Sequence, residues 1–163
     1  MPTQTMTVTV RNGLIHIKYS HEGLVGIDLR DSLKRPPSHR QDAPTGLVKT
    51  LWLKDAISRL RSYFAKNDSR LEEIPFDFST GSRFQKEVWE ACRKIRFGEV
   101  RSYSWIAEKV GKPQSQRAVG QALGRNPLPL VVPCHRVIRA DGGLGGFSAG
   151  LDIKRALLSI EGH

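Results

Sequence analysis

The spacing of apolar residues changes about halfway along this chain, and that change limits the folds it can adopt. In the first part, polar and apolar residues alternate over short runs, which is the pattern of half-buried strands. In the second part, apolar residues recur every three or four positions, as in amphipathic helices. The chain has 163 residues, which is room for two small domains. We predict an α/β N-terminal domain over residues 1–78 and a mainly α C-terminal domain over residues 79–163.

The N-terminal part predicts a small antiparallel sheet. Residues 5–10 and 14–17 alternate on either side of the turn signal Asn12-Gly13 and predict a hairpin. Residues 24–29 predict a third strand.

One helix and two connecting segments complete this part. Residues 31–46 are polar and rich in proline, which indicates a loop, and residues 74–78 suggest a short edge strand or a crossing between domains. Residues 51–64 predict an amphipathic helix that packs on the sheet. Its expected inner face is Leu51, Ala56, Ile57, Leu60 and Phe64.

The C-terminal part predicts three helices in succession. Ser82 and Gln85 form a capping-box pattern that begins the first helix, and Gly98 is expected to close it. Ser102 is expected to cap a second, short helix and Ser115 a third over residues 116–124. Two short helices joined by a tight turn indicate a helix-turn-helix.

Charge favours a nucleic acid as the partner of the second part. Residues 79–163 carry 14 Lys+Arg and 7 Asp+Glu (+7), against 12 and 9 (+3) in residues 1–78, which together give the net charge of +10. A basic excess around a helix-turn-helix indicates DNA binding, whereas the same excess elsewhere is more often a solvated surface. The outward residues Gln116, Arg117, Gly120 and Arg125 of the third helix are therefore candidate DNA contacts.

Composition also bears on the compartment. No apolar run approaches the roughly 20 residues that span a bilayer, and the N-terminus lacks the layout of a signal peptide. We expect a cytoplasmic protein, or a nuclear one if its source is eukaryotic. The two cysteines, Cys92 and Cys134, are then expected to be free thiols, with Cys92 a buried structural residue.

Cys134 is the candidate nucleophile. It follows an expected apolar strand over residues 128–132 and stands in the run Pro-Cys-His-Arg-Val. A reactive cysteine needs a base, which His135 supplies if Pro133 imposes a turn or a water bridges the two groups. Glu161 is a candidate to orient that histidine. A Cys-His pair is weak evidence by itself, because buried structural cysteines are common.

Residues 79–163 resemble the methylated-DNA–protein-cysteine methyltransferase family, the O6-alkylguanine-DNA alkyltransferases. The motifs that carry the resemblance are, in order, Phe84-Gln85 with Val88-Trp89, Ser102-Tyr103, Arg117-Ala118-Val119-Gly120, Asn126-Pro127, Pro133-Cys134-His135-Arg136-Val137, Gly145-Gly146-Phe147, and Lys154 with Leu157-Leu158 and Glu161. The resemblance implies a ribonuclease-H-like first domain and a winged-helix-like second domain. It also implies that an O6-alkylguanine is turned out of duplex DNA and its alkyl group is moved irreversibly to Cys134.

The resemblance assigns roles to further residues. His135 relays the thiol proton through a water, Glu161 orients His135, and Tyr103 helps to rotate the nucleotide and donates a hydrogen bond to the purine. Asn126 joins the recognition helix to the segment that carries the cysteine, and Arg117 fills the space of the expelled base. The recognition helix enters the minor groove, where small residues such as Ala118 and Gly120 allow close approach. The remaining predicted contacts to DNA or substrate are Ser115, Gln116, Arg125, Val137, Gly145, Phe147 and Ser148.

Departures from the family pattern concern the pocket and the metal site. Phe147 stands where many relatives have tyrosine, which leaves the range of alkyl groups open, and Gln121 is bulkier than the glycine of some relatives. Both cysteines lie beyond residue 90, so we expect no N-terminal zinc site, and no cofactor is implied. The expected partner is double-stranded DNA, with no membrane and no obligate protein partner, and the protein is expected to be a monomer.

Two alternatives remain from the sequence. A non-catalytic protein that binds alkyl lesions shares the DNA-binding residues but replaces the reactive cysteine, which is present here. A helix-turn-helix regulator accounts for the charge but not for Cys134, His135 and Glu161. Taken singly, Tyr103 is equally well explained as an aromatic residue of the core, and Asn126 as a residue that forms a turn.

Overall fold

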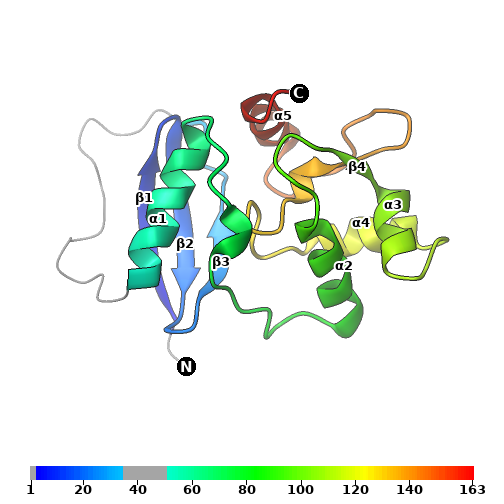
Figure 1. Ribbon diagram of the computed structural model, residues 1–163, viewed down its shortest axis with the longest axis horizontal. Helices are drawn as coiled ribbons and strands as arrows, with labels where there is room; N and C mark the ends of the chain where they lie inside the picture. The colour runs from blue at the N-terminus through cyan, green and yellow to red at the C-terminus, as the bar shows by residue number, and fades with distance from the viewer. Residues whose placement is uncertain (1–2, 35–50) are drawn as a thin grey trace. The chain divides into compact units, whose positions relative to one another are not determined.

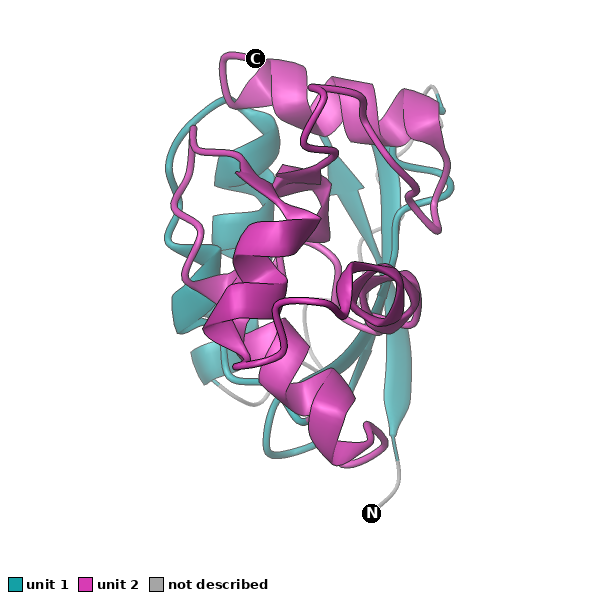
Figure 2. Ribbon diagram, turned by 90° about the vertical axis from the view of Figure 1, so that its right-hand side faces the viewer, with its two compact units in different colours: residues 1–77 teal, residues 78–163 magenta. Residues whose placement is uncertain are grey.

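The protein divides into two compact units in a computed structural model that describes residues 3–34 and 51–163 (Figure 2). The first unit is residues 1–77 and the second is residues 78–163. The loop expected at residues 31–46 lies outside the described residues from position 35 onward. The arrangement agrees with the predicted order of an α/β domain followed by a helical one.

The first unit contains a three-stranded antiparallel sheet in the order β1-β2-β3 (Figure 1). The strands are β1 (Gln4–Val10), β2 (Gly13–Tyr19) and β3 (Leu24–Asp28). Val10 pairs with Gly13 across the Asn12 turn, so the predicted hairpin is confirmed. Alternate side chains of β1 and β2 are buried, as the alternating sequence requires.

Helix α1 (Leu51–Phe64) has the predicted bounds and lies against the sheet (Figure 1). Its buried residues are Leu53, Ala56, Leu60, Tyr63 and Phe64. The prediction was wrong for Leu51, which is 86% exposed, and Ile57 lies outside this buried set. Leu53, Ala56 and Leu60 are spaced by three and four residues and define the inner stripe, which Leu51 does not share because it is two residues out of phase with Leu53.

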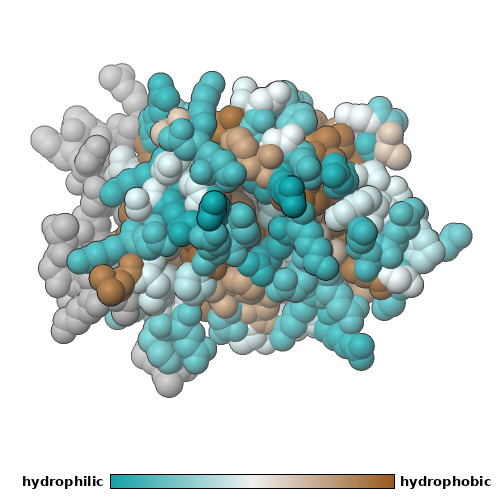
Figure 3. Space-filling view, viewed as in Figure 1, coloured by the Kyte–Doolittle hydropathy of each residue, from teal (hydrophilic) through white to brown (hydrophobic). Residues whose placement is uncertain are grey.

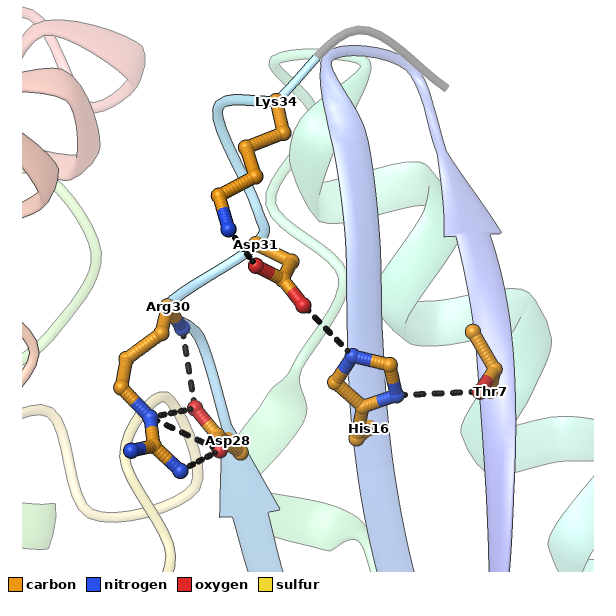
Figure 4. A network of polar contacts seen from close by, with 6 residues as sticks. All are labelled: Thr7, His16, Asp28, Arg30, Asp31 and Lys34. Carbon is orange, nitrogen blue, oxygen red and sulfur yellow. Dashed lines mark hydrogen bonds and ion pairs between the residues drawn. The ribbon is translucent and has the colours of Figure 1, made fainter. Parts of the chain in front are cut away.

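A polar network on the hairpin holds the chain that leaves β3 (Figure 4). Thr7 Oγ1 and His16 Nδ1 share a hydrogen bond of 2.9 Å, and His16 Nε2 lies 3.0 Å from Asp31 Oδ2. Asp31 also pairs with Lys34, and Leu14 N donates to the Asp31 carbonyl oxygen at 3.0 Å. Side-chain and backbone contacts thus tie this segment to β2.

The segment after α1 is less regular than expected. A short 3₁₀ helix, η1 (Leu71–Glu73), precedes a single bridge between Phe76 and Leu24, so residues 74–78 do not form a strand. Leu24 N donates to Pro75 O at 2.8 Å, and Asp77 N donates to Leu24 O at 2.9 Å. Pro75 has no N–H with which to extend the pairing.

The second unit begins with α2 (Arg83–Arg93), whose start was predicted correctly. Gln85 N donates to Ser82 Oγ at 3.3 Å and Ser82 N donates to Gln85 Oε1 at 2.8 Å, which completes a capping box. The helix ends at Arg93, so Gly98 does not close it; Gly98 lies in a later turn with a φ of 77°.

Helices α3 (Tyr103–Lys109) and α4 (Gln116–Gly124) form the predicted helix-turn-helix and pack on α2. Trp89 Nε1 of α2 donates to the Ala122 carbonyl oxygen of α4 at 2.9 Å. Ser102 caps α3 by accepting from Trp105 N. The Ser115 side chain does not cap α4, contrary to expectation, because its hydroxyl donates to Lys112 O at 2.6 Å.

A two-residue parallel pair joins the helix-turn-helix to the cysteine segment. Strand β4 (Arg101–Ser102) pairs with β5 (Val137–Ile138), and α5 (Leu151–Ile160) follows. The apolar run at residues 128–132 is not the strand that we predicted. It turns back on itself, with a single bridge between its second and last residues, and Leu130 has a φ of 81°.

The described surface is mainly hydrophilic on the face shown in Figure 3. Within residues 3–34 and 51–163, no helix has the length and apolar character needed to cross a bilayer.

Two serines at helix starts provide a matched test of this description. Ser82→Ala removes the side-chain acceptor of the α2 capping box and should lower the free energy of unfolding by about 1 kcal/mol. Ser115→Ala removes no cap and should change stability by less than half of that. Urea denaturation of both variants measures the difference, and equal losses would contradict the distinct roles of the two hydroxyls.

Candidate active site

Cys134 is placed by a sharp change of chain direction rather than by a strand. Pro133 has φ −78° and ψ 62°, and Cys134 N donates to Val132 O at 2.8 Å, which closes a three-residue turn. The chain then enters a 3₁₀ helix, η2 (Cys134–Arg136). Pro133 therefore imposes a turn, which was one of the two possibilities that the sequence left open. The left-handed Leu130 just before it is a strained conformation for a residue with a side chain.

Asn126 fixes this turn through both ends of its side chain. Its Nδ2 donates to Val132 O at 2.9 Å and to Cys134 Sγ at 3.2 Å, and its Oδ1 accepts from Leu128 N at 2.9 Å. Asn126 follows α4 directly and is 8% exposed. One buried amide thus links the end of the helix-turn-helix to the sulfur atom.

His135 and Glu161 are in direct contact, as predicted. His135 Nε2 donates to Glu161 Oε1 at 2.7 Å, and both side chains are fully buried. Burial would raise the pKa of Glu161, but hydrogen bonds from His135 and Arg136 outweigh it and lower the pKa to about 2. Glu161 is therefore ionised at neutral pH and holds the imidazole in one orientation.

Arg136 is a second partner of Glu161 that sequence reasoning missed. Its Nε donates to Glu161 Oε2 at 2.8 Å and its Nη2 donates to Oε1 at 2.9 Å, while Gly98 N donates to Oε2 at 3.2 Å. A buried carboxylate is stable only when its oxygens are paired in this way. The signal in the sequence was the basic residue directly after the Cys-His pair.

Lys154 is another buried polar residue that the sequence analysis left without a role. It is fully buried, and its Nζ donates to Val137 O at 2.7 Å, to Gly146 O at 3.2 Å and to Leu144 O. Burial lowers the pKa of Lys154 to about 8. A detectable signal existed, because Lys154 shares the spacing of the apolar residues Leu157 and Leu158 on α5.

A pocket of about 880 Å³ opens beside Cys134 in the second unit. It is bounded by the helix-turn-helix and by the chain between β5 and α5, so its walls come from segments distant in sequence. Its lining consists of Tyr103, Gln116, Arg117, Gly120, Gln121, Leu123, Gly124, Cys134, Arg139, Gly145, Gly146, Phe147 and Ser148. Cys134 is only 6% exposed, so a reagent must enter this pocket to reach it.

Most of the residues predicted to contact DNA or substrate line this pocket. Ser115, Ala118 and Arg125 lie outside the lining, on or beside α4. Val137 is fully buried in β5 and offers its carbonyl to Lys154 instead. The sequence analysis gave no role to Arg139, which does line the pocket.

Tyr103 and Gly145 lie close together in the lining of the pocket. Gly145 has a φ of 69°, and a Cβ atom built there would lie 2.4 Å from the Tyr103 hydroxyl. Only glycine fits this position. Burial raises the pKa of Tyr103, which keeps its hydroxyl protonated and able to donate a hydrogen bond at neutral pH.

Two opposing influences act on the Cys134 thiol. Burial raises its pKa, whereas the hydrogen bond from Asn126 and the charge of Lys154 lower it. The net shift is upward, so the resting sulfur is a thiol and needs a base in order to react. Burial lowers the pKa of His135, so its imidazole is neutral and able to accept a proton. Cys92 is also fully buried and free, as predicted, and burial raises its pKa strongly.

No group of three His, Cys, Asp or Glu side chains suited to a metal ion occurs within residues 3–34 and 51–163.

Adjacent glycines allow a test of the pocket geometry. Gly145→Ala forces a methyl group into Tyr103 and should slow alkylation of Cys134 by O6-benzylguanine on the order of 10²-fold. Gly146→Ala is the control, because a Cβ there meets no atom within 4 Å. Intact-mass measurement over time follows the reaction, and equal rates in the two variants would show that the close approach of Tyr103 is unimportant.

Comparison with known proteins identifies relatives of this chain. The family model "6-O-methylguanine DNA methyltransferase, DNA binding domain" matches residues 83–163. The methylated-DNA–protein-cysteine methyltransferase of Methanosarcina acetivorans is 45% identical over 112 residues, which cover 68% of this chain and 70% of that protein. The enzyme of the same name from Mycolicibacterium paratuberculosis is 49% identical over 107 residues, covering 65% of this chain and 63% of that protein.

A solved structure extends the similarity to the first unit. The O6-methylguanine methyltransferase of Mycobacterium tuberculosis is 33% identical, with a TM-score of 0.76 over 98% of this chain and 93% of that one. A second structure of the M. tuberculosis protein, in complex with DNA, is 35% identical, with a TM-score of 0.76 over 96% and 91% of the two chains. The chain therefore belongs to the methylated-DNA–protein-cysteine methyltransferase family.

Proposed function

We propose that this protein repairs DNA by direct reversal, moving the alkyl group of an O6-alkylguanine onto Cys134. The observation that carries the proposal is that Cys134 lines a pocket of about 880 Å³ and is followed in sequence by His135, which is hydrogen-bonded to Glu161. Family membership supports the same reaction. The protein is a DNA-repair methyltransferase that acts once per molecule, since a thioether has no ordinary route back to a thiol.

The reaction is a displacement at the alkyl carbon. The Cys134 proton passes to His135, through a water, and the sulfur attacks the carbon bonded to guanine O6. The new S–C bond forms as the O6–C bond breaks, and the electron pair of that bond goes to the guanine. Because Glu161 engages Nε2 of His135, the proton is accepted at Nδ1, and Glu161 stabilises the charged imidazolium.

The guanine is made a better leaving group by proton donation. Tyr103 donates a hydrogen bond to the purine, a role that its raised pKa and its place in the lining support. Ser148 lines the same pocket, and its hydroxyl or backbone amide approaches O6 of the bound base. Phe147 supplies an aromatic surface for the base.

DNA binds through the second unit, with α4 in the minor groove. Arg117 enters the base stack and fills the space of the extruded nucleotide, which offsets part of the few kcal/mol that extrusion costs. Ala118 is exposed and Gly120 is half-buried, and because both residues are small, α4 can approach the walls of the groove closely. Ser115, Gln116 and Arg125 contact the sugar-phosphate backbone.

The first unit corresponds to the ribonuclease-H-like domain of the family, and its described residues include the sheet β1-β2-β3 and helix α1. The protein acts as a monomer in the cytoplasm, or in the nucleus if its source is eukaryotic.

One experiment distinguishes this function from its two alternatives. Incubation with a duplex that carries O6-methylguanine should add the mass of one methyl group to the intact protein, and Cys134→Ala should abolish the gain while DNA binding persists. Binding to the lesion without any gain in mass would indicate a lesion-binding protein. Indifference to the lesion would indicate a DNA-binding regulator, and either result would contradict the proposal.

A further inference from the structure

Arg139 is a cation at the pocket that the proposed reaction does not use. Only two of the pocket-lining residues carry a formal charge, Arg117 and Arg139, and both are positive. They come from different walls, because Arg117 belongs to α4 and Arg139 directly follows β5. A negatively charged group in the pocket would therefore lie between two cations, one on each wall, and would face no carboxylate of the lining residues.

A tight turn holds Arg139 in this position. Arg139 N donates to Gly143 O at 2.7 Å, and Gly142 N donates back to Arg139 O at 3.0 Å. The arginine stem passes over Gly143, where an added Cβ would lie 3.3 Å from Arg139 Cδ. Asp141 accepts from Gly143 N through Oδ1 at 2.9 Å, which leaves its Oδ2 3.2 Å from Arg139 Nη2.

The pair between Arg139 and Asp141 is suited to exchange. Its side chains are 63% and 61% exposed, and ion pairs so open to water contribute little to stability. A phosphate offers the guanidinium two parallel hydrogen bonds in the same way as a carboxylate does. Arg139 can therefore give up the carboxylate of Asp141 at little cost in free energy.

We propose that Arg139 exchanges Asp141 for a DNA backbone phosphate next to the extruded nucleotide. The inference rests on the proposed function, since a nucleotide turned into this pocket stays joined to the strand by phosphates on both sides. Those phosphates must remain at the mouth of the pocket, where the Arg139 side chain is exposed. Arg117 is occupied within the base stack, so Arg139 is the lining cation that remains for them. Asp141 is an internal competitor for the same guanidinium.

The first test compares duplex DNA with a free base. Arg139→Gln should lower the second-order rate of repair of an O6-methylguanine duplex about tenfold, and it should make the dependence of log rate on log salt shallower by about 1. Its reaction with free O6-benzylguanine should stay within about twofold of wild type, since the free base carries no phosphate. Arg139→Lys should keep the salt dependence and lose part of the rate, because lysine retains the charge but not the paired hydrogen bonds.

Arg83→Gln is the matched control. Arg83 is an exposed arginine of α2 that pairs with Glu87 and does not line the pocket, so its loss removes the same charge elsewhere. This variant should keep the duplex rate within about twofold of wild type. A salt dependence in Arg139→Gln equal to that of wild type would overturn the proposal. So would equal losses on duplex and free base, which would make Arg139 a residue that shapes the pocket.

Asp141→Asn tests the competition. Asparagine keeps an acceptor for Gly143 N but gives up the charge, so the duplex rate should rise about threefold when Arg139 is present. In the Arg139→Gln background the same change should have almost no effect. An equal rise in both backgrounds would contradict the competition between Asp141 and phosphate. Failure of the wild-type protein to react with either substrate would instead contradict the proposed function.

Discussion

The second unit depends on the hydrogen bonds and ion pairs made by the buried carboxylate of Glu161. It binds the His135 imidazole, the Arg136 guanidinium and the backbone N–H of Gly98, and so connects the end of α5 to η2 and to the turn after α2. These contacts compensate the free-energy cost of burying a charge. Burial raises the pKa of Glu161, and the hydrogen bonds from His135 and Arg136 lower it by more. The same carboxylate orients His135, the proposed base.

Burial has two consequences for the Cys134 thiol, one protective and one that hinders its reaction. Cys134 is shielded from solvent, which protects the thiol from unwanted reactions but raises its pKa. Around this thiol lie the neutral His135 at the next residue, the Asn126 amide that donates to the sulfur, and the ammonium group of Lys154, whose charge lowers the pKa of the thiol. The buried Lys154 also fixes the loop that forms one wall of the pocket, through three backbone carbonyls. Reactivity and pocket shape therefore depend on the same few buried polar groups.

Local patterns in the sequence predicted the elements well, and the errors have physical causes. The hairpin, α1, the start of α2 and the helix-turn-helix follow from spacing and capping, which act over a few residues. The run at residues 128–132 reads as a strand but turns back, since it contains one proline and precedes another, neither of which can donate to a ladder. The partners of Arg136 and Lys154 lie on segments distant in sequence, so the local pattern signals a basic or buried residue but not what it binds.

The central claim is that a neutral His135, held by Glu161, removes the proton from the Cys134 thiol. The most direct test is the rate of Cys134 alkylation by O6-benzylguanine as a function of pH. Because the pKa of His135 is lowered, the rate should stay on a plateau through neutral pH and fall only below about pH 6.5. Glu161→Gln should lower the plateau by about 10²-fold. A rate that rises tenfold per pH unit from pH 6 to 9, and that is unchanged in Glu161→Gln, would contradict the account, because the thiol would then ionise without help from His135.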